Sequence, residues 1–221
     1  MELQVGSDDF GKVRSKDLNF MKIIFLDIDG VLQPEYPAIR FTNFDVKNIL
    51  IQTPYGAKQP RLIEEITAQY NSAAMSSLDC LRACLAEIDS GYNSLDKYDV
   101  AAVCCDWDKE SVNLLRKLCN VTGAKIVISS DWRLSKTLEQ LKLLFKIHEL
   151  DNFVIDMTAT IVGMHPLQVK EYITTHSNVV RFVILDDGYR QEFEQMFPSE
   201  FIYHKYCLDI ARYHKAESLL K

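Results

Sequence analysis

The feature that most constrains this 221-residue chain is an apolar run that ends abruptly in acidic residues. Met21 to Leu26 is apolar apart from Lys22, and Asp27-Ile28-Asp29-Gly30 follows at once. An unbroken apolar run is typical of a strand that helices cover on both faces. Small polar residues and a glycine directly after it indicate a tight turn. The run therefore predicts a buried first strand with two aspartates at its carboxyl end.

Further strand candidates alternate with helical patterns along the chain. Short apolar runs occur at residues 125–128, 153–155, 179–185 and 201–203. Helical patterns lie between them, at residues 110–119 with Asp108 as N-cap, 136–148 after Ser135, and 166–175 with a first-turn proline. This alternation predicts an α/β fold, a Rossmann-like doubly wound parallel sheet.

Residues 34–105 separate the first strand from the next unit by far more than an ordinary crossover. Apolar residues from Ile63 to Ile88 recur at three- and four-residue steps, which predicts one long amphipathic helix or two helices divided near residues 71–77. Residues 48–53 and 100–105 have strand-like composition and are interpreted as a hairpin. We thus expect an N-terminal arm (1–20), a core domain (21–33 and 106–221) and a mainly helical insertion (34–105).

Composition and charge narrow the classes of partner. The chain is 48% hydrophobic with a formal net charge of −6, so it reads as globular, and nucleic acid is the weaker partner prediction. No apolar stretch approaches the roughly 20 residues of a membrane helix, and the first residues lack a secretory h-region. The six cysteines show neither metal-type nor disulfide-type spacing, which predicts free thiols and a reducing, cytoplasmic location.

Polar residues follow three of the strand candidates. They are Asp27 and Asp29, the stretch Ser129-Ser130-Asp131-Trp132-Arg133, and Asp186-Asp187-Gly188. Ligands bind beyond the carboxyl ends of the strands in an open α/β sheet. Each set alone is compatible with an ordinary turn, but four aspartates at one sheet edge repel one another unless a cation binds, and Mg²⁺ prefers oxygen ligands and phosphate. Together they predict a magnesium phosphate site.

These motifs resemble those of the haloacid-dehalogenase-like (HAD) class. Asp27-x-Asp29-Gly30-Val31 matches its DxDGT/V signature, Ser129 matches its Ser/Thr after the second strand, and Asp186-Asp187 matches its final acidic pair. The stretches around Asp27 and Ser129 look most like a branch of small HAD phosphatases related to the phosphatase modules of RNA-repair proteins. The resemblance covers residues 21–33 and 106–190.

The resemblance implies a role for each motif residue. Asp27 would attack phosphorus and form an aspartyl phosphate, while Asp29 would act as general acid and then as general base. Mg²⁺ would be held by Asp27, the backbone carbonyl of Asp29, and Asp186 or Asp187, with Asp186 the first choice. Ser129 would bind the phosphoryl group, and Gly30 would let backbone amides cradle its oxygens.

Three further residues are candidates for phosphate binding. Ser130 and Arg133 lie on the loop after the second strand, where Arg133 is expected either to clamp phosphate or to make a surface ion pair. The class also places a cation before the last acidic motif. Lys170 is the first choice, and a protonated His165 is the alternative if Lys170 faces solvent.

The sequence hence predicts a Mg²⁺-dependent phosphomonoester hydrolase that acts on a phosphorylated small molecule or a phosphoprotein, phosphotyrosine included. The alternatives are a catalytically silent HAD-fold binding module and a polynucleotide-end phosphatase. Asp29 argues against dehalogenation, because a leaving halide needs no proton. The insertion is expected to form a cap over the site, or else to extend the core. Several aromatic residues are candidates for stacking on the substrate: Tyr36, Tyr55, Trp107, Trp132 and Tyr189.

Overall fold

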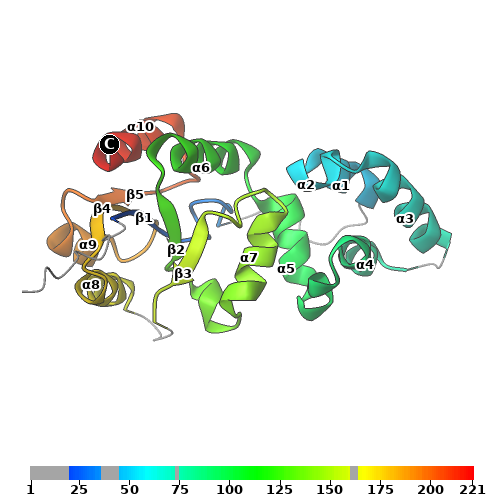
Figure 1. Cartoon of the computed structure of the whole chain (residues 1–221), viewed down its shortest axis with the longest axis horizontal. Helices are drawn as coiled ribbons and strands as arrows, with labels where there is room; N and C mark the ends of the chain where they lie inside the picture. Colours follow the sequence, from blue (N-terminus) through cyan, green and yellow to red (C-terminus); the bar gives the residue numbers. More distant parts are fainter. Residues whose placement is uncertain (1–19, 36–44, 73–74, 160–163) are drawn as a thin grey trace, which may run out of the picture.

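The computed structural model describes residues 20–35, 45–72, 75–159 and 164–221 (Figure 1). The expected N-terminal arm lies outside these residues except for Phe20, and so does Tyr36. Among the described residues, no helix is both long and apolar enough to cross a bilayer. All six cysteines fall within the described ranges and carry free thiols.

Five strands form one parallel sheet in the order β3-β2-β1-β4-β5. Their bounds are Met21–Leu26 (β1), Lys125–Ile128 (β2), Val154–Met157 (β3), Val179–Asp186 (β4) and Phe201–Tyr203 (β5). All five lie where apolar runs predicted them, within two residues at each end. The expected α/β fold with a doubly wound parallel sheet and a helical insertion after the first strand is confirmed.

Alternate side chains of each strand point to opposite faces of the sheet, and the sheet is buried because helices cover both of these faces. Ile23 and Phe25 of β1 pack on one face under α8 (His165–Thr175) and α9 (Arg190–Met196). Ile24 and Leu26 belong to the opposite face, which α6 (Lys109–Thr122), α7 (Leu138–Lys146) and α10 (Ile210–Leu220) cover. Figure 1 shows α6 and α10 on one side of the strands and α8 and α9 on the other.

The insertion is mainly helical in its described part. It contains α1 (Val46–Gln52), α2 (Pro54–Ala57), α3 (Pro60–Ser72), α4 (Ser77–Ile88) and α5 (Lys97–Ala101), with short 3₁₀ and π segments η1 (Ser90–Ser94) and η2 (Ala102–Asp106). Of the two helical alternatives, two separate helices, α3 and α4, are found. Figure 1 places α1 to α4 at the end of the molecule beyond α7.

The hairpin expected from residues 48–53 and 100–105 is wrong, because these segments form α1 and the α5–η2 helical stretch. The Asp45 carboxylate caps α1 by accepting a hydrogen bond from the Asn48 amide, and Val46 and Leu50, four residues apart, bury one helical face. Tertiary burial of that face outweighs the β-type composition.

The helix expected from residue 136 begins two residues later, at Leu138. Thr137 and Gln140 form a reciprocal capping box there, which satisfies the first amides of α7 and places Lys136 outside the helix. The other two predicted starts hold: Asp108 caps α6, and Pro166 lies in the first turn of α8.

Candidate active site

The carboxyl ends of β1, β2 and β4 meet at one edge of the sheet. The Asp27 amide donates to the Leu185 carbonyl (2.9 Å), and the Ser129 amide donates to the Leu26 carbonyl (2.9 Å). Asp186 is the last residue of β4. Backbone pairing therefore brings the three motifs together, as expected for ligand-binding residues of an open α/β sheet.

Two carboxylates and an imidazole form a buried cluster at this edge. One ligand atom each from Asp27, His165 and Asp186 lies within 4.8 Å of the others, and all three side chains are buried. Burial, together with the Asp186 carboxylate, raises the pKa of Asp27 well above its usual range, although the Ser130 hydroxyl and His165 oppose this shift. Two acids held this close in a dry site favour a cation between them.

His165 rather than Lys170 is the basic side chain that the structure brings to this cluster. His165 Nδ1 lies 3.2 Å from Asp186 Oδ2, and its Nε2 lies 3.0 Å from Asp131 Oδ1. Burial would lower the pKa of His165, but the hydrogen bonds to Asp186 and Asp131 outweigh it, so the pKa is raised. Lys170 lies on the same helix, α8, with its side chain exposed. Position 165 opens that helix beside β4, whereas position 170 faces solvent.

Arg133 has a buried guanidinium that neighbouring protein groups already engage, and its predicted phosphate contact stays a prediction. Its Nη1 donates to the carbonyls of Ser129 (2.7 Å) and Ser130 (2.5 Å), its Nε donates to the Ala159 carbonyl (3.2 Å), and its Nη2 donates to Gln168. It also lies 3.4 Å from Asp131, whose carboxylate is largely exposed. Arg133 hence ties the loop after β2 to α8 and holds the two serines in place. Sequence reasoning missed Gln168, which gives no signal on a helix of mixed polarity.

The two serines of that loop differ in their contacts. Ser130 caps the 3₁₀ helix η3 (Asp131–Leu134), and its hydroxyl also bonds the Asp27 carboxylate. Ser129 is fully buried, and its Oγ has no hydrogen-bond partner among the described residues. A buried hydroxyl with no protein partner leaves its hydrogen-bonding capacity open to a ligand oxygen. This position suits the predicted contact with a phosphoryl group.

Asp29 is held by two residues that the sequence reading did not assign to it. Trp132 Nε1 donates to Asp29 Oδ2 (2.9 Å), and Gln33 Nε2 donates to Asp29 Oδ1 (3.0 Å). Gln33 is a buried polar residue directly after the apolar pair Val31-Leu32. In the sequence, only this polar residue after an apolar pair could have indicated a partner for Asp29. Trp132 was a candidate for stacking on substrate, which stays a prediction, and its indole nitrogen contacts the acid.

Gly30 is required by its conformation and by its neighbour. Its φ is +72°, and a Cβ atom there would lie 2.0 Å from Asp187 Oδ2. The Gly30 amide donates to the Gln33 carbonyl (2.7 Å), so it closes the turn, and the expected amide cradle for phosphate stays a prediction. Burial and the carboxylates of Asp186, Glu35 and Asp29 raise the pKa of Asp187 to about 6.

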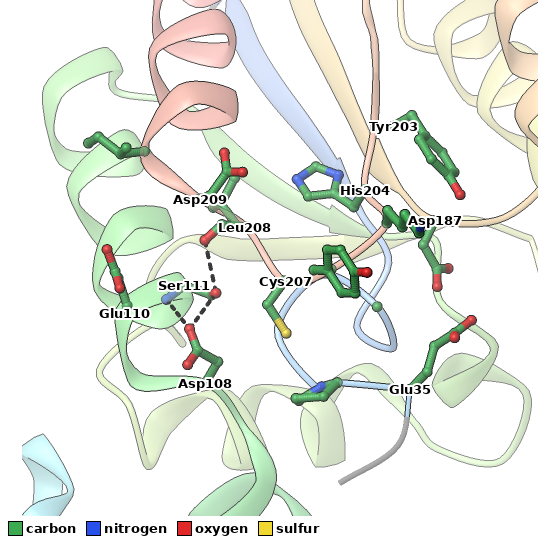
Figure 2. Close-up of a pocket in the computed structure, with 15 residues that line it drawn as sticks. Glu35, Asp108, Glu110, Ser111, Asp187, Tyr203, His204, Cys207, Leu208 and Asp209 are labelled. Atoms are coloured by element: carbon green, nitrogen blue, oxygen red, sulfur yellow. Dashed lines mark hydrogen bonds between the residues drawn. The ribbon is translucent and has the colours of Figure 1, made fainter.

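Two cavities open beside the motifs. The larger, of about 770 Å³, is lined by Gly30 and Asp187 and by the stretch from Tyr203 to Ile210; Figure 2 shows Asp187 and Glu35 on one side of it and Asp108, which bonds Ser111, on the other. The smaller, of about 370 Å³, is lined by Asp29 and reaches Tyr98, Asp99 and Ala102 of the insertion. Of the remaining candidate stacking residues, Trp107 and Tyr55 pack in the core, and Tyr189 lies against His165 with ring centroids 4.8 Å apart.

The residues at this edge fit a hard divalent cation. Asp27 and Asp186 offer oxygen ligands in the buried cluster, and Asp187 lies next to them on the turn after β4. Mg²⁺ is bound by one or two carboxylates together with water and phosphate oxygens, which matches such a sparse set. The raised pKa of Asp27 follows from burial and from the nearby Asp186 carboxylate, the two effects that a bound cation would offset.

Comparison with known proteins identifies the family. Residues 23–207 match the family model described as the HAD domain in Swiss Army Knife RNA repair proteins, which confirms the resemblance seen in the motifs. No curated protein and no solved structure matches the chain. The match spans most of the 221 residues and contains every motif of the buried edge. The chain therefore belongs to the family of HAD domains found in Swiss Army Knife RNA repair proteins.

Proposed function

We propose that the protein is a Mg²⁺-dependent phosphomonoester hydrolase that acts through an aspartyl phosphate on Asp27. Family membership supports a phosphatase-type function, and one observation carries the finer proposal. Asp27 is buried with Asp186 and His165, and the free Ser129 hydroxyl lies on the neighbouring strand end. A nucleophile, a counter-charge and a phosphate-binding hydroxyl then share one desolvated edge.

Each residue has a defined part in the proposed reaction. An Asp27 carboxylate oxygen attacks phosphorus, the bond from phosphorus to the leaving oxygen breaks, and Asp29 gives that oxygen a proton. Asp29 then takes a proton from water, the water oxygen attacks phosphorus, and the bond to Asp27 breaks to release inorganic phosphate. Mg²⁺, held by Asp27, Asp186 and the Asp29 carbonyl with Asp187 nearby, would neutralise charge on the phosphoryl oxygens.

The surrounding residues orient this chemistry. His165, which bonds Asp186, adds positive charge near the phosphoryl site in the role first expected of Lys170. Ser129 donates its hydroxyl to a phosphoryl oxygen, and Arg133 fixes Ser129 and Ser130 through their carbonyls. Tyr98, Asp99 and Ala102 bring the insertion to the pocket beside Asp29, so the insertion takes part in substrate selection.

The first test is hydrolysis of para-nitrophenyl phosphate with Mg²⁺ and with EDTA. Asp27→Asn should lower turnover by a factor on the order of 10⁴, because it removes the nucleophile. Asp156→Asn is the matched control: the same change on β3 of the same sheet, where the carboxylate accepts the Met157 amide (2.9 Å) and bonds the Tyr172 side chain. It should leave turnover unchanged. Equal activity in Asp27→Asn and wild type would refute the proposal, and EDTA-resistant activity would refute its metal dependence.

Two observations point to different classes of substrate. A small phosphorylated metabolite or a phosphoprotein suits the net charge of −6, which disfavours a polynucleotide. The family description, which names RNA repair proteins, favours a phosphorylated polynucleotide end. Values of kcat/KM for phosphotyrosine peptides, sugar phosphates and end-phosphorylated oligonucleotides, measured at one ionic strength, decide between these classes.

A further inference from the structure

Each oxygen of the Asp29 carboxylate accepts a hydrogen bond, and the two donors come from two different loops. Gln33 belongs to the turn after β1 and bonds Oδ1 (3.0 Å), whereas Trp132 belongs to η3 after β2 and bonds Oδ2 (2.9 Å). Gln33 is almost fully buried. Two donors at opposite oxygens fix both the position and the plane of a carboxylate, which a single bond leaves free to rotate.

The indole that makes one of these bonds is itself held by the insertion. The Lys136 ammonium lies 4.9 Å above the centre of the Trp132 ring, where a cation–π contact forms. Lys136 also pairs with the Asp99 carboxylate of α5 at 3.1 Å, and its side chain is only 11% exposed. A continuous chain of contacts thus runs from the insertion through Lys136 and Trp132 to Asp29.

The held carboxylate faces a space that suits a departing group. Asp29, Gln33 and Trp132 line the pocket of about 370 Å³ together with Lys136 and insertion residues. Proton transfer to a leaving oxygen requires the acid within hydrogen-bond reach and correctly aimed, and misplacement by about 1 Å costs on the order of 100-fold in rate.

We propose that Trp132 and Gln33 are positioning residues that aim the Asp29 proton at the leaving oxygen, and that the insertion supports them through Asp99 and Lys136. This inference rests on the proposed phosphatase function and deepens it. The substrates most dependent on this device are esters of weakly acidic alcohols, because their alkoxides leave poorly without a proton.

The test compares two identical substitutions in neighbouring tryptophans. Trp132→Phe keeps an aromatic ring but removes the N–H that bonds Asp29. Trp107→Phe is the matched control, because the Trp107 ring lies 6.3 Å from that of Trp132 and its Nε1 has no partner among the described residues. For each protein, kcat/KM is measured with aryl phosphates of increasing phenol pKa and with an alkyl phosphate, and log kcat/KM is plotted against leaving-group pKa.

We expect the slope of this plot to steepen in Trp132→Phe and to equal that of wild type in Trp107→Phe. The loss should be roughly 10- to 100-fold for the poorest leaving groups and small for the best, since the best need no general acid. Gln33→Met, which removes the other donor at similar volume, should steepen the slope as well. A loss that is uniform across the series in both Trp132→Phe and Gln33→Met would overturn the inference, because disrupted packing acts on all substrates alike.

The part assigned to the insertion has its own variant. Lys136→Met removes the charge that links Asp99 to the indole and keeps the apolar stem, so the slope should change in the same direction by less. An unchanged slope in Lys136→Met would overturn the insertion's part alone. Absence of wild-type turnover on every substrate refutes the proposed function, whereas wild-type turnover with an unchanged slope in Trp132→Phe refutes only this inference.

Discussion

At the scale of single residues, the site requires a glycine conformation as well as its carboxylates. Gly30 and Gly123 both have φ of +72°, a conformation that costs other residues about 1 kcal/mol. They differ in what surrounds them: a Cβ at Gly30 would meet Asp187, whereas a Cβ at Gly123 would meet nothing within 4 Å. Substituting each glycine in turn therefore distinguishes the effect of backbone strain, which both share, from the effect of displacing the Asp187 carboxylate, which only Gly30 has.

Backbone strain should therefore lower the free energy of unfolding of Gly30→Ala and of Gly123→Ala by a similar amount, about 1 kcal/mol. Only Gly30→Ala should also lower Mg²⁺-dependent turnover, because Asp187 must move away from the new methyl group. Urea denaturation and para-nitrophenyl phosphate hydrolysis measure the two effects. If both variants keep wild-type turnover, the close approach of Gly30 and Asp187 has no role in catalysis.

At the scale of elements, a buried histidine in the turn after α7 contacts the π segment η2 of the insertion. His148 Nε2 lies 2.9 Å from the Val103 carbonyl, and its ring stacks on Trp107 with centroids 5.5 Å apart. Burial lowers the pKa of His148 to about 4. The neutral ring is thus part of the junction between η2 and the turn after α7.

The lowered pKa predicts a pH dependence of stability. Between the unfolded pKa of about 6.5 and about 4, the unfolded chain binds a proton at this histidine and the folded chain does not, so stability falls as pH falls through this window. His148→Phe keeps a ring on Trp107 and removes the titrating group. The wild-type free energy of unfolding minus that of the variant should fall by up to about 1.4 kcal/mol per pH unit. Urea denaturation from pH 7 to pH 4.5 measures it; parallel curves for the two proteins contradict the prediction.

At the scale of the whole molecule, the insertion is packed into the core rather than set apart from it. One apolar cluster contains Leu50 and Leu81 of the insertion together with Trp107, Phe145 and Ile126 of the core layers. Shared burial of this kind makes two regions unfold together. We propose that the described part of residues 34–105 forms one cooperative unit with the core, while its edge near Asp29 selects the substrate.

Leu81→Ala tests this unity, because Leu81 is fully buried in α4. The variant should lose about 2–5 kcal/mol from lost burial and the cavity left behind. Trp107 and Trp132 both lie outside residues 34–105, so tryptophan fluorescence reports on the core, and its transition should shift with the helical circular dichroism. Leu62→Ala, the same change at an exposed position of α3, should shift neither. A fluorescence transition that stays at wild-type urea concentration in Leu81→Ala would show separate units.

The sequence by itself determined the sheet, its order of alternation with helices, and the residues at the carboxyl edge of the sheet. These features depend on local sequence, because a buried strand appears as a run of apolar residues. The carboxyl ends of parallel strands then meet at one edge wherever such a sheet forms. Asp27, Ser129 and Asp186 could accordingly be placed together before any contact was known. The helical character of α3 and α4 was predicted for the same reason, since the period of their apolar residues is a local signal, but that period left open whether they form one helix or two.

The tertiary structure alone decided which side chains point at one another across the chain. His165 rather than Lys170 reaches Asp186, Arg133 turns inward to carbonyls, and Trp132 meets Asp29 across 103 positions of sequence. Segments 48–53 and 100–105 became helical because burial against other helices outweighs their weak strand preference. Contacts of this kind depend on how elements pack at long range, and neither residue type nor spacing records that packing.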